Sequence, residues 1–111
     1  MPAEVEIGLV GAGDVEGAVI KSGGVGFEGL ELELVDANGA VVATTRSDYD
    51  GYFLFERAPY GTYKVRIAKA SADAAKVAQE LDASATVTEG AAVVRLGSIQ
   101  VEPLPLIAST E

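Results

Sequence analysis

The chain has 111 residues, which suits one domain with a single core that needs no crosslinks. It carries 17 acidic and 8 basic residues, and the net charge of −9 argues against nucleic acid or an anionic membrane surface as partner, since both need clustered lysine and arginine. It has no cysteine and no histidine, which excludes disulfides, thiolate metal sites and the usual neutral-pH general base.

The N-terminal part alternates apolar and polar residues with a period of two, the period of a half-buried strand. We expect one strand at residues 4–9, with Val5, Ile7 and Leu9 on one face, and a second at 15–21. Residues 22–26 are rich in glycine and predict a flexible loop. A phosphate-binding loop would need a helix after it, and no helical pattern follows.

The middle of the chain alternates in the same way and is divided by turn residues. The pair Asn38-Gly39 predicts a tight hairpin, because glycine tolerates the positive φ that such turns require. Residues 48–51 and 59–61 predict two further turns. Phe53, Phe55 and Tyr63 fall on the apolar positions and are predicted core residues. Strands are expected at 30–35, 41–46, 52–56 and 62–68.

The period changes after residue 70. Ala74, Val77, Ala78 and Leu81 follow the spacing of one helix face, so a short helix is expected near 71–81, with Ser71 as its N-cap. Extended segments are expected around 86–87, 91–94 and 96–102, with a bulge or break at Gly97 and with Ile99 and Val101 in the core.

These elements predict an all-β fold: a seven- to eight-stranded antiparallel Greek-key β-sandwich with one short helix. We expect a single domain at residues 1–103 and an apolar C-terminal tail at 104–111.

Residues 14–68 resemble the transthyretin-like (prealbumin-like) sandwich and, within it, the carboxypeptidase regulatory-like domains. The run from Val41 to Glu56 is most similar to versions found in bacterial outer-membrane usher-type or adhesin-type proteins. The resemblance implies the fold and says little about activity, because such domains serve many functions. It also implies that the strand at 30–35 neighbours the strand at 62–67. Glu31 and Glu33 would then share an exposed face with Lys64 and Arg66. The resemblance rests on the segments 15–19, 29–36, 38–39, 45–55 and 59–65.

The chemistry of related proteins does not transfer to this chain. Hydroxyisourate hydrolases and intradiol dioxygenases resemble transthyretin but need histidine, which is missing here. Related surface domains carry a Lys–Asn isopeptide crosslink promoted by a Glu. Lys21 could supply the lysine, but Ile67 stands where the Glu would fall, and the chain's one asparagine, Asn38, lies in a hairpin. We therefore expect no crosslink and no enzyme activity.

Asp48 and Asp50 before Gly51 are typical of a calcium loop. EF-hand spacing fails, because positions one and twelve would be Arg46 and Arg57. A looser calcium site using Asp48 and Asp50 with Glu56 or Asp36 stays open. The alternative is that the aspartates cap the turn through their own backbone. We favour that role, so no cofactor or metal is expected.

Tyr49, Tyr52 and Tyr60 fall in or beside turns, where they could form an exposed recognition surface. A carbohydrate- or calcium-binding module using the loops at 48–52 and 58–61 is therefore the alternative function. We expect the carboxylates of Glu31 and Glu33 to form an exposed acidic stripe on one strand and not a catalytic pair.

The function expected first is a non-catalytic accessory module of an exported bacterial protein, with a structural, assembly or protein-recognition role. It would act in the periplasm, at the outer membrane or on the cell surface. No apolar run approaches the roughly 18 residues of a membrane-spanning helix, and the first residues lack a signal-peptide pattern. A neighbouring domain or a protein partner is expected, and the tail at 104–107 could form a homodimer contact.

Overall fold

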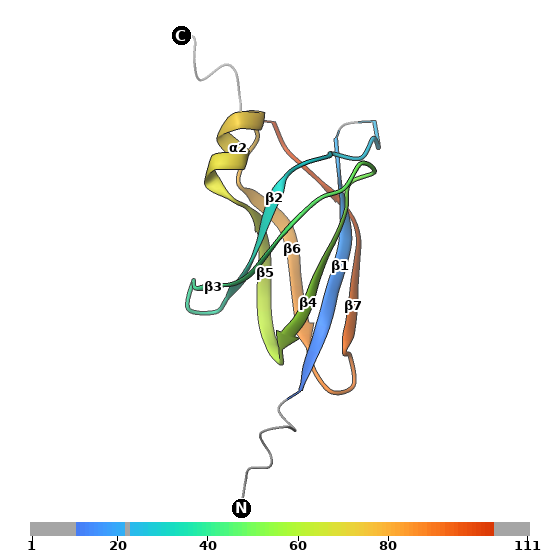
Figure 1. Cartoon of the computed structure of the whole chain (residues 1–111), viewed down its shortest axis with the longest axis vertical. Helices are drawn as coiled ribbons and strands as arrows, with labels where there is room; N and C mark the ends of the chain where they lie inside the picture. Colours follow the sequence, from blue (N-terminus) through green and yellow to red (C-terminus); the bar gives the residue numbers. More distant parts are fainter. Residues whose placement is uncertain (1–10, 22, 104–111) are drawn as a thin grey trace, which may run out of the picture.

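The computed structural model describes residues 11–21 and 23–103, and they form a two-layer β-sandwich (Figure 1). One sheet has three strands in the order β4-β1-β7, and the other has four in the order β3-β2-β5-β6. The predicted strand at 4–9 and the tail at 104–111 lie outside the described residues. The bounds are β1 Ala12–Ile20, β2 Glu31–Asp36, β3 Val41–Arg46, β4 Tyr52–Pro59, β5 Gly61–Ile67, α2 Lys69–Ala75, β6 Glu80–Val87 and β7 Val93–Gln100.

The strands form where the sequence alternates. Along β1 every second residue from Gly13 to Val19 is buried, and β6 alternates without interruption from Glu80 to Val87. The buried faces of the two sheets meet in one core, whose largest fully buried side chains are Phe53 and Phe55. Their rings pack edge to face with centroids 5.7 Å apart, a favoured aromatic geometry. Both phenylalanines, Tyr63, Ile99 and Val101 are buried, which confirms the predicted core.

The predicted pairing of the strands near 30–35 and 62–67 is confirmed. β2 and β5 are antiparallel neighbours, with Glu33 opposite Arg66. The hairpin at Asn38-Gly39 is confirmed as well, since Gly39 has φ +85°. The Asp36 carboxylate supports this hairpin by accepting hydrogen bonds from the backbone amides of Asn38 and Ala40, both at 2.9 Å.

One pair departs from the expected antiparallel arrangement. β1 and β7 are parallel neighbours, with Glu16 opposite Arg95 and Val19 opposite Ile99. The register shifts between Glu16 and Ala18, beside Gly97 with φ +73°, so Gly97 is the predicted bulge. Because β1 and β7 run the same way, the chain enters the sandwich at one end and leaves it at the other (Figure 1).

The helix is shorter than predicted. α2 spans Lys69–Ala75, its N-cap is Ala68 and not Ser71, and it ends at Lys76 in the left-handed conformation. Val77 and Leu81 are buried, but in extended backbone. The alternation from Leu81 to Val87 belongs to β6, a strand longer than the predicted segment at 86–87, because these residues pair with β5. Tertiary pairing therefore overrides a local helical spacing.

Candidate functional site

We define the outgoing end of the sandwich as residues 23–29, the turn 47–51, α2 and residues 101–103. Here Val101 N–H donates to the Ile20 carbonyl, so the last described residues leave beside the end of β1. The incoming end is Gly11, residues 59–61 and the turn 88–91. Here Tyr60 N–H donates to the Gly11 carbonyl. Every predicted site residue can be placed relative to these two ends.

Asp48 and Asp50 lie at the outgoing end and cap the turn between β3 and β4. Asp48 Oδ1 accepts from the amides of Asp50 at 3.1 Å and Tyr52 at 3.0 Å, and Gly51 supplies φ +86°. The neighbouring carboxyl group of Asp50, together with these amides, lowers the pKa of Asp48. The carboxyl group of Asp48 in turn raises the pKa of Asp50. The two carboxyl groups thus serve the turn's own backbone.

The looser calcium set is not assembled. Glu56 lies within β4, and Asp36 supports the hairpin after β2. In the described part of the chain no three acidic side chains come together in a way that could hold a metal ion.

The three tyrosines do not form one surface. Tyr49 and Tyr52 lie at the outgoing end, whereas Tyr60 follows the last residue of β4 at the incoming end. β4 has eight residues, so these two groups are separated by about 26 Å of strand. Tyr60 lies against Gly11, where a Cβ atom would stand 1.8 Å from the tyrosine ring.

The Tyr52 hydroxyl donates to Glu16 Oε1 at 2.6 Å, and Arg95 Nε donates to Glu16 Oε2 at 2.8 Å. This bridge joins all three strands of the β4-β1-β7 sheet. The hydrogen bond from Tyr52 is the main cause of a lowered pKa of Glu16, and the hydrogen bond from Arg95 lowers it further. Sequence reasoning missed the bridge, because its residues lie 36 and 79 positions apart and no local pattern relates them.

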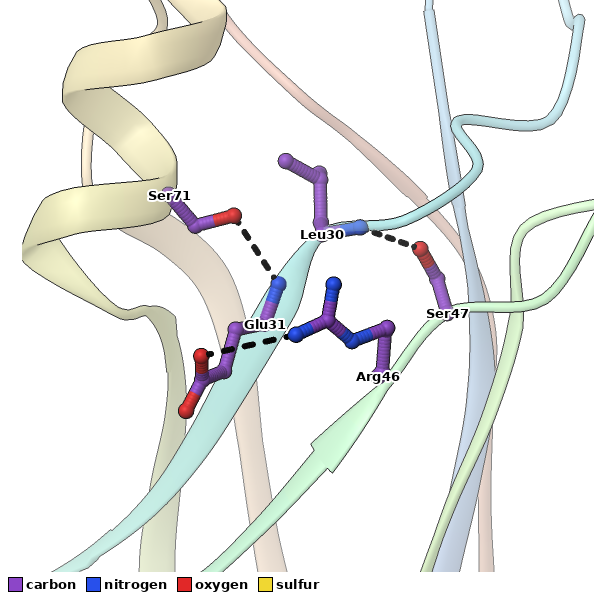
Figure 2. A network of polar contacts seen from close by, with 5 residues as sticks. All are labelled: Leu30, Glu31, Arg46, Ser47 and Ser71. Atoms are coloured by element: carbon purple, nitrogen blue, oxygen red, sulfur yellow. Dashed lines mark hydrogen bonds and ion pairs between the residues drawn. The ribbon is translucent and has the colours of Figure 1, made fainter.

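A second network, also missed, fixes the start of β2 at the outgoing end (Figure 2). Ser47 is buried; its Oγ accepts from Leu30 N–H at 2.9 Å and donates to the Phe27 carbonyl at 2.6 Å. Ser71 Oγ accepts from Glu31 N–H at 3.0 Å and thereby docks α2 on β2. These serines satisfy backbone groups that would otherwise lose their hydrogen bonds on burial.

The carboxylates of Glu31 and Glu33 each form an ion pair with an arginine. Glu33 Oε1 lies 2.7 Å from Arg66 Nε, and Glu31 Oε1 lies 3.9 Å from Arg46 (Figure 2). The predicted shared face of Glu33 and Arg66 is therefore present, while Glu31 turns to β3. No pocket opens on the described residues, and none of their helices is long and apolar enough to cross a membrane.

The residues considered for an isopeptide crosslink lie in different surroundings. Lys21 Nζ stands over the Phe27 ring, 5.1 Å from its centroid, which is a cation–π contact. Ile67 is fully buried in the core, and Asn38 is exposed in the hairpin that follows β2. The expected absence of a crosslink stays a prediction, which an intact mass measurement can check.

The fold defines a prealbumin-like β-sandwich. A family model described as the SdrD B-like domain matches residues 13–101, so the chain belongs to that family, whose sandwiches occur in adhesins and pilins. This confirms the resemblance to prealbumin-like domains and extends it beyond residue 68. Among curated proteins, Colossin-A of Dictyostelium discoideum is 50% identical over 38 residues, which are 34% of this chain and a share of Colossin-A that rounds to 0%.

Solved structures with this fold include pilus proteins. BcpA, the major pilin subunit of Bacillus cereus, has a TM-score of 0.62 at 22% identity, over 83% of this chain and 30% of BcpA. The group B streptococcus pilus 2b backbone protein has a TM-score of 0.59 at 17% identity, over 88% of this chain and 43% of that protein. The Bacillus anthracis TIE protein has a TM-score of 0.60 at 16% identity, over 79% of this chain and 17% of that protein. The chain thus spans less than half of these proteins, and domains of this kind form part of larger chains.

Proposed function

We propose that this domain is a non-catalytic structural module of an exported surface protein, where it links neighbouring parts of a longer chain. The observation that carries the proposal is the parallel pairing of β1 and β7. It places residue 11 and residue 103 at opposite ends of the sandwich, so neighbours on the two sides are held apart by the length of the strands.

The same pairing suits a module under tension. A pull on the chain before β1 and after β7 acts along two parallel strands that are hydrogen-bonded to each other. Sliding them apart must break several of these bonds together, since every bond lies across the direction of pull. The Glu16–Arg95 ion pair crosses the same two strands.

The chemistry of the surface fits a structural role. The chain lacks histidine, and the carboxyl groups with shifted pKa values each have a partner within the fold, as in the Asp48–Asp50 turn and the Glu16 bridge. Family membership supports the same role, because the family occurs in adhesins and pilins. The proposed site of action is the exterior of the cell, either on its surface or in the periplasm.

Single-molecule pulling tests the proposal. The chain has no cysteine, so a pair of introduced cysteines gives defined attachment points. One experiment pulls on the two chain ends. The control uses Thr62→Cys with Thr86→Cys, which face each other across β5 and β6 near the incoming end and would peel those strands apart one bond at a time.

We expect a clearly higher unfolding force at the chain ends than in the control geometry. Forced unfolding follows the barrier to unfolding, so it reports this resistance directly. An equal or lower force at the chain ends would contradict a force-transmitting role.

The segment 104–107 is proposed as a contact for a neighbouring domain or a second copy. Unchanged stability and association state after deletion of residues 103–111 would argue against that contact.

A further inference from the structure

Four strands lie at the edges of the two sheets: β3 and β6 in one sheet, and β4 and β7 in the other. An edge strand leaves backbone N–H and C=O groups without a neighbour, and proteins protect such edges with charges, prolines or bulges. β4 has a bulge at Arg57, with φ +59°, and ends in Pro59. β7 has the bulge at Gly97, and β6 exposes the carboxylates of Glu80 and Asp82. These three edges are therefore protected.

β3 lacks such protection along most of its length. Its sequence, Val-Val-Ala-Thr-Thr-Arg, has no proline and one charge, and most of its residues are β-branched and favour strands. Val41 and Val42 are consecutive and are 43% and 40% exposed. The register shift against β2 falls beside these valines, so the strand is regular from Ala43 to Arg46. The other exposed large apolar and aromatic side chains of the described residues are dispersed over other segments: Val25, Tyr49, Tyr52, Tyr60 and Val93.

The outward backbone groups of β3 follow from its pairing with β2. Ser47, directly after β3, donates its N–H to the Leu30 carbonyl and accepts from Gly29 N–H, so both of its groups face the β2 side. In an antiparallel pair successive residues face alternate sides. The N–H and C=O groups of Thr44 and Arg46 therefore point away from β2. Among the described residues no strand lies on that side of β3.

We propose that β3 is a self-association edge, at which β3 of one copy pairs antiparallel with β3 of a second copy, with Thr44 opposite Thr44 of that copy. The pairing is its own mirror under a two-fold axis, so each contact is made twice. It sets Val42 against the aliphatic stem of Arg46 of the second copy, and threonine pairs across strands are favourable. The two four-stranded sheets then become one continuous sheet.

Charge favours this edge over the others. The chain has a net charge of −9, so like charges oppose association over most of its surface. The one charge of β3 is Arg46, and in the proposed register its two copies lie four residues apart along the strands, about 14 Å. The carboxylates opposite β3, Glu31 and Glu33, are each paired with an arginine. Self-pairing of β6 would instead bring the carboxylates of Glu80 and Asp82 from both copies to the joint.

The β3 edge lies along the side of the sandwich, whereas the chain enters and leaves at its two ends (Figure 1). Pairing at β3 therefore leaves both chain ends free. The inference goes beyond the proposed linking role and does not depend on it, because the pulling experiment examines one copy and self-association needs two.

Sedimentation equilibrium of the 111-residue chain tests the association. We expect the average mass to rise towards that of a dimer as the concentration approaches about 1 mM, since a six-residue edge gives a joint smaller than a standard interface. Added salt should strengthen the association, because it screens the repulsion between the acidic copies. A mass that stays monomeric over this range would overturn the proposal.

Two lysine variants locate the joint. Thr44→Lys sets like charges directly opposite each other at the two-fold axis and should weaken the association about tenfold or more. Ser84→Lys makes the same change of charge on the exposed face of β6 and should not weaken it. Thr44→Val, which keeps a β-branched side chain, should also associate like the parent. Equal weakening by the two lysine variants would overturn the assignment to β3.

Cysteine crosslinking tests the register, since the chain has no cysteine of its own. Thr44→Cys would bring the two Cα atoms to about 5.5 Å, within the range of a disulfide. Arg46→Cys, on the same face of the same strand, would leave its two copies about 14 Å apart, beyond that range. With oxidised glutathione we expect Thr44→Cys to form a covalent dimer about tenfold faster or more. Equal crosslinking of the two variants would overturn the proposed pairing.

Discussion

The carboxylate of Glu16 binds the guanidinium of Arg95 across the parallel pair β1–β7, with Oε2 2.8 Å from Nε. Arg95 extends into solvent, whereas only 23% of the Glu16 side chain is exposed. With the hydrogen bond from Tyr52, the contact ties the first strand, the last strand and β4 together on the outer face of the sheet.

This bridge predicts a pH dependence. In the folded state the hydrogen bond from Tyr52, and to a smaller extent the one from Arg95, lowers the pKa of Glu16 below its ordinary value of 4.5. The Glu16 carboxylate therefore contributes fully to stability above pH 4.5. This contribution is lost as the pH falls below 4.5 through the lowered pKa. Glu16→Gln should therefore melt at a lower temperature than the parent at pH 7, and the difference should shrink towards pH 3. Glu56→Gln, at an exposed carboxylate of β4 with no described partner, is the control and should show no such convergence.

Removing the buried hydroxyl of Ser47 should be costly. Ser47→Ala leaves the buried Leu30 N–H without its acceptor, which costs about 1–3 kcal/mol in the free energy of unfolding. Ser71→Ala should cost less, because the Glu31 amide it releases is only partly buried. Ser84→Ala, on the exposed face of β6, should be close to neutral. Urea denaturation of the three variants checks this order, and a neutral Ser47→Ala would contradict the assigned role.

The hydroxyl of Tyr63 donates to the Pro59 carbonyl and holds the corner between β4 and β5. Tyr63→Phe keeps the buried ring and removes this bond, so we expect a loss of about 0.5–1.5 kcal/mol. Tyr60→Phe is the matched control, since no hydrogen bond of its hydroxyl is described. Equal stabilities of the two variants would show that the corner bond contributes nothing.

The acidic turn predicts a negative result with calcium. Asp48 Oδ1 accepts two backbone amides and Asp50 Oδ1 one, so Asp48→Ala should lower the melting temperature more than Asp50→Ala. Millimolar calcium should leave the melting temperature of the parent chain unchanged, because a ligand stabilises only the state that it binds. A rise in the parent that is lost in both variants would establish a calcium site.

Alternation was sufficient to predict most strands and the core phenylalanines, because a half-buried strand needs a period of two wherever it lies. The β2–β5 pairing was predicted from the resemblance to the transthyretin-like sandwich, since alternation does not tell which strands are neighbours. Alternation failed at Leu81, which fits both the helical spacing from Ala74 and the alternation to Val87. Only pairing with β5 decides between them. Similarly, the direction of β7 beside β1 follows from how the chain crosses between sheets, and nothing within either strand encodes it.

The candidate site was harder to predict than the fold. Asp48 acts within its own turn and was identified from local sequence. Ser47 and Glu16 act on residues 17 to 79 positions away, so their partners appear only when the sheets are assembled. The three turn tyrosines looked equivalent in sequence, but β4 separates Tyr60 from the other two.

The contact between the two loops of the outgoing end can be tested with glycine substitutions. Gly26→Ala would place a Cβ atom 2.1 Å from the Asp50 carbonyl oxygen, and both sides of that contact are backbone. Neither can rotate away, so the loops must separate, at a cost of about 1–3 kcal/mol as for other overpacked sites. Gly90→Ala is the matched control, because a Cβ atom there meets nothing within 4 Å.

Chemical denaturation of both variants should show a lower midpoint for Gly26→Ala with an unchanged slope, and little change for Gly90→Ala. An unaffected Gly26→Ala would mean that the loops are not held against each other. The result therefore reports directly how the two loops of the outgoing end pack on each other.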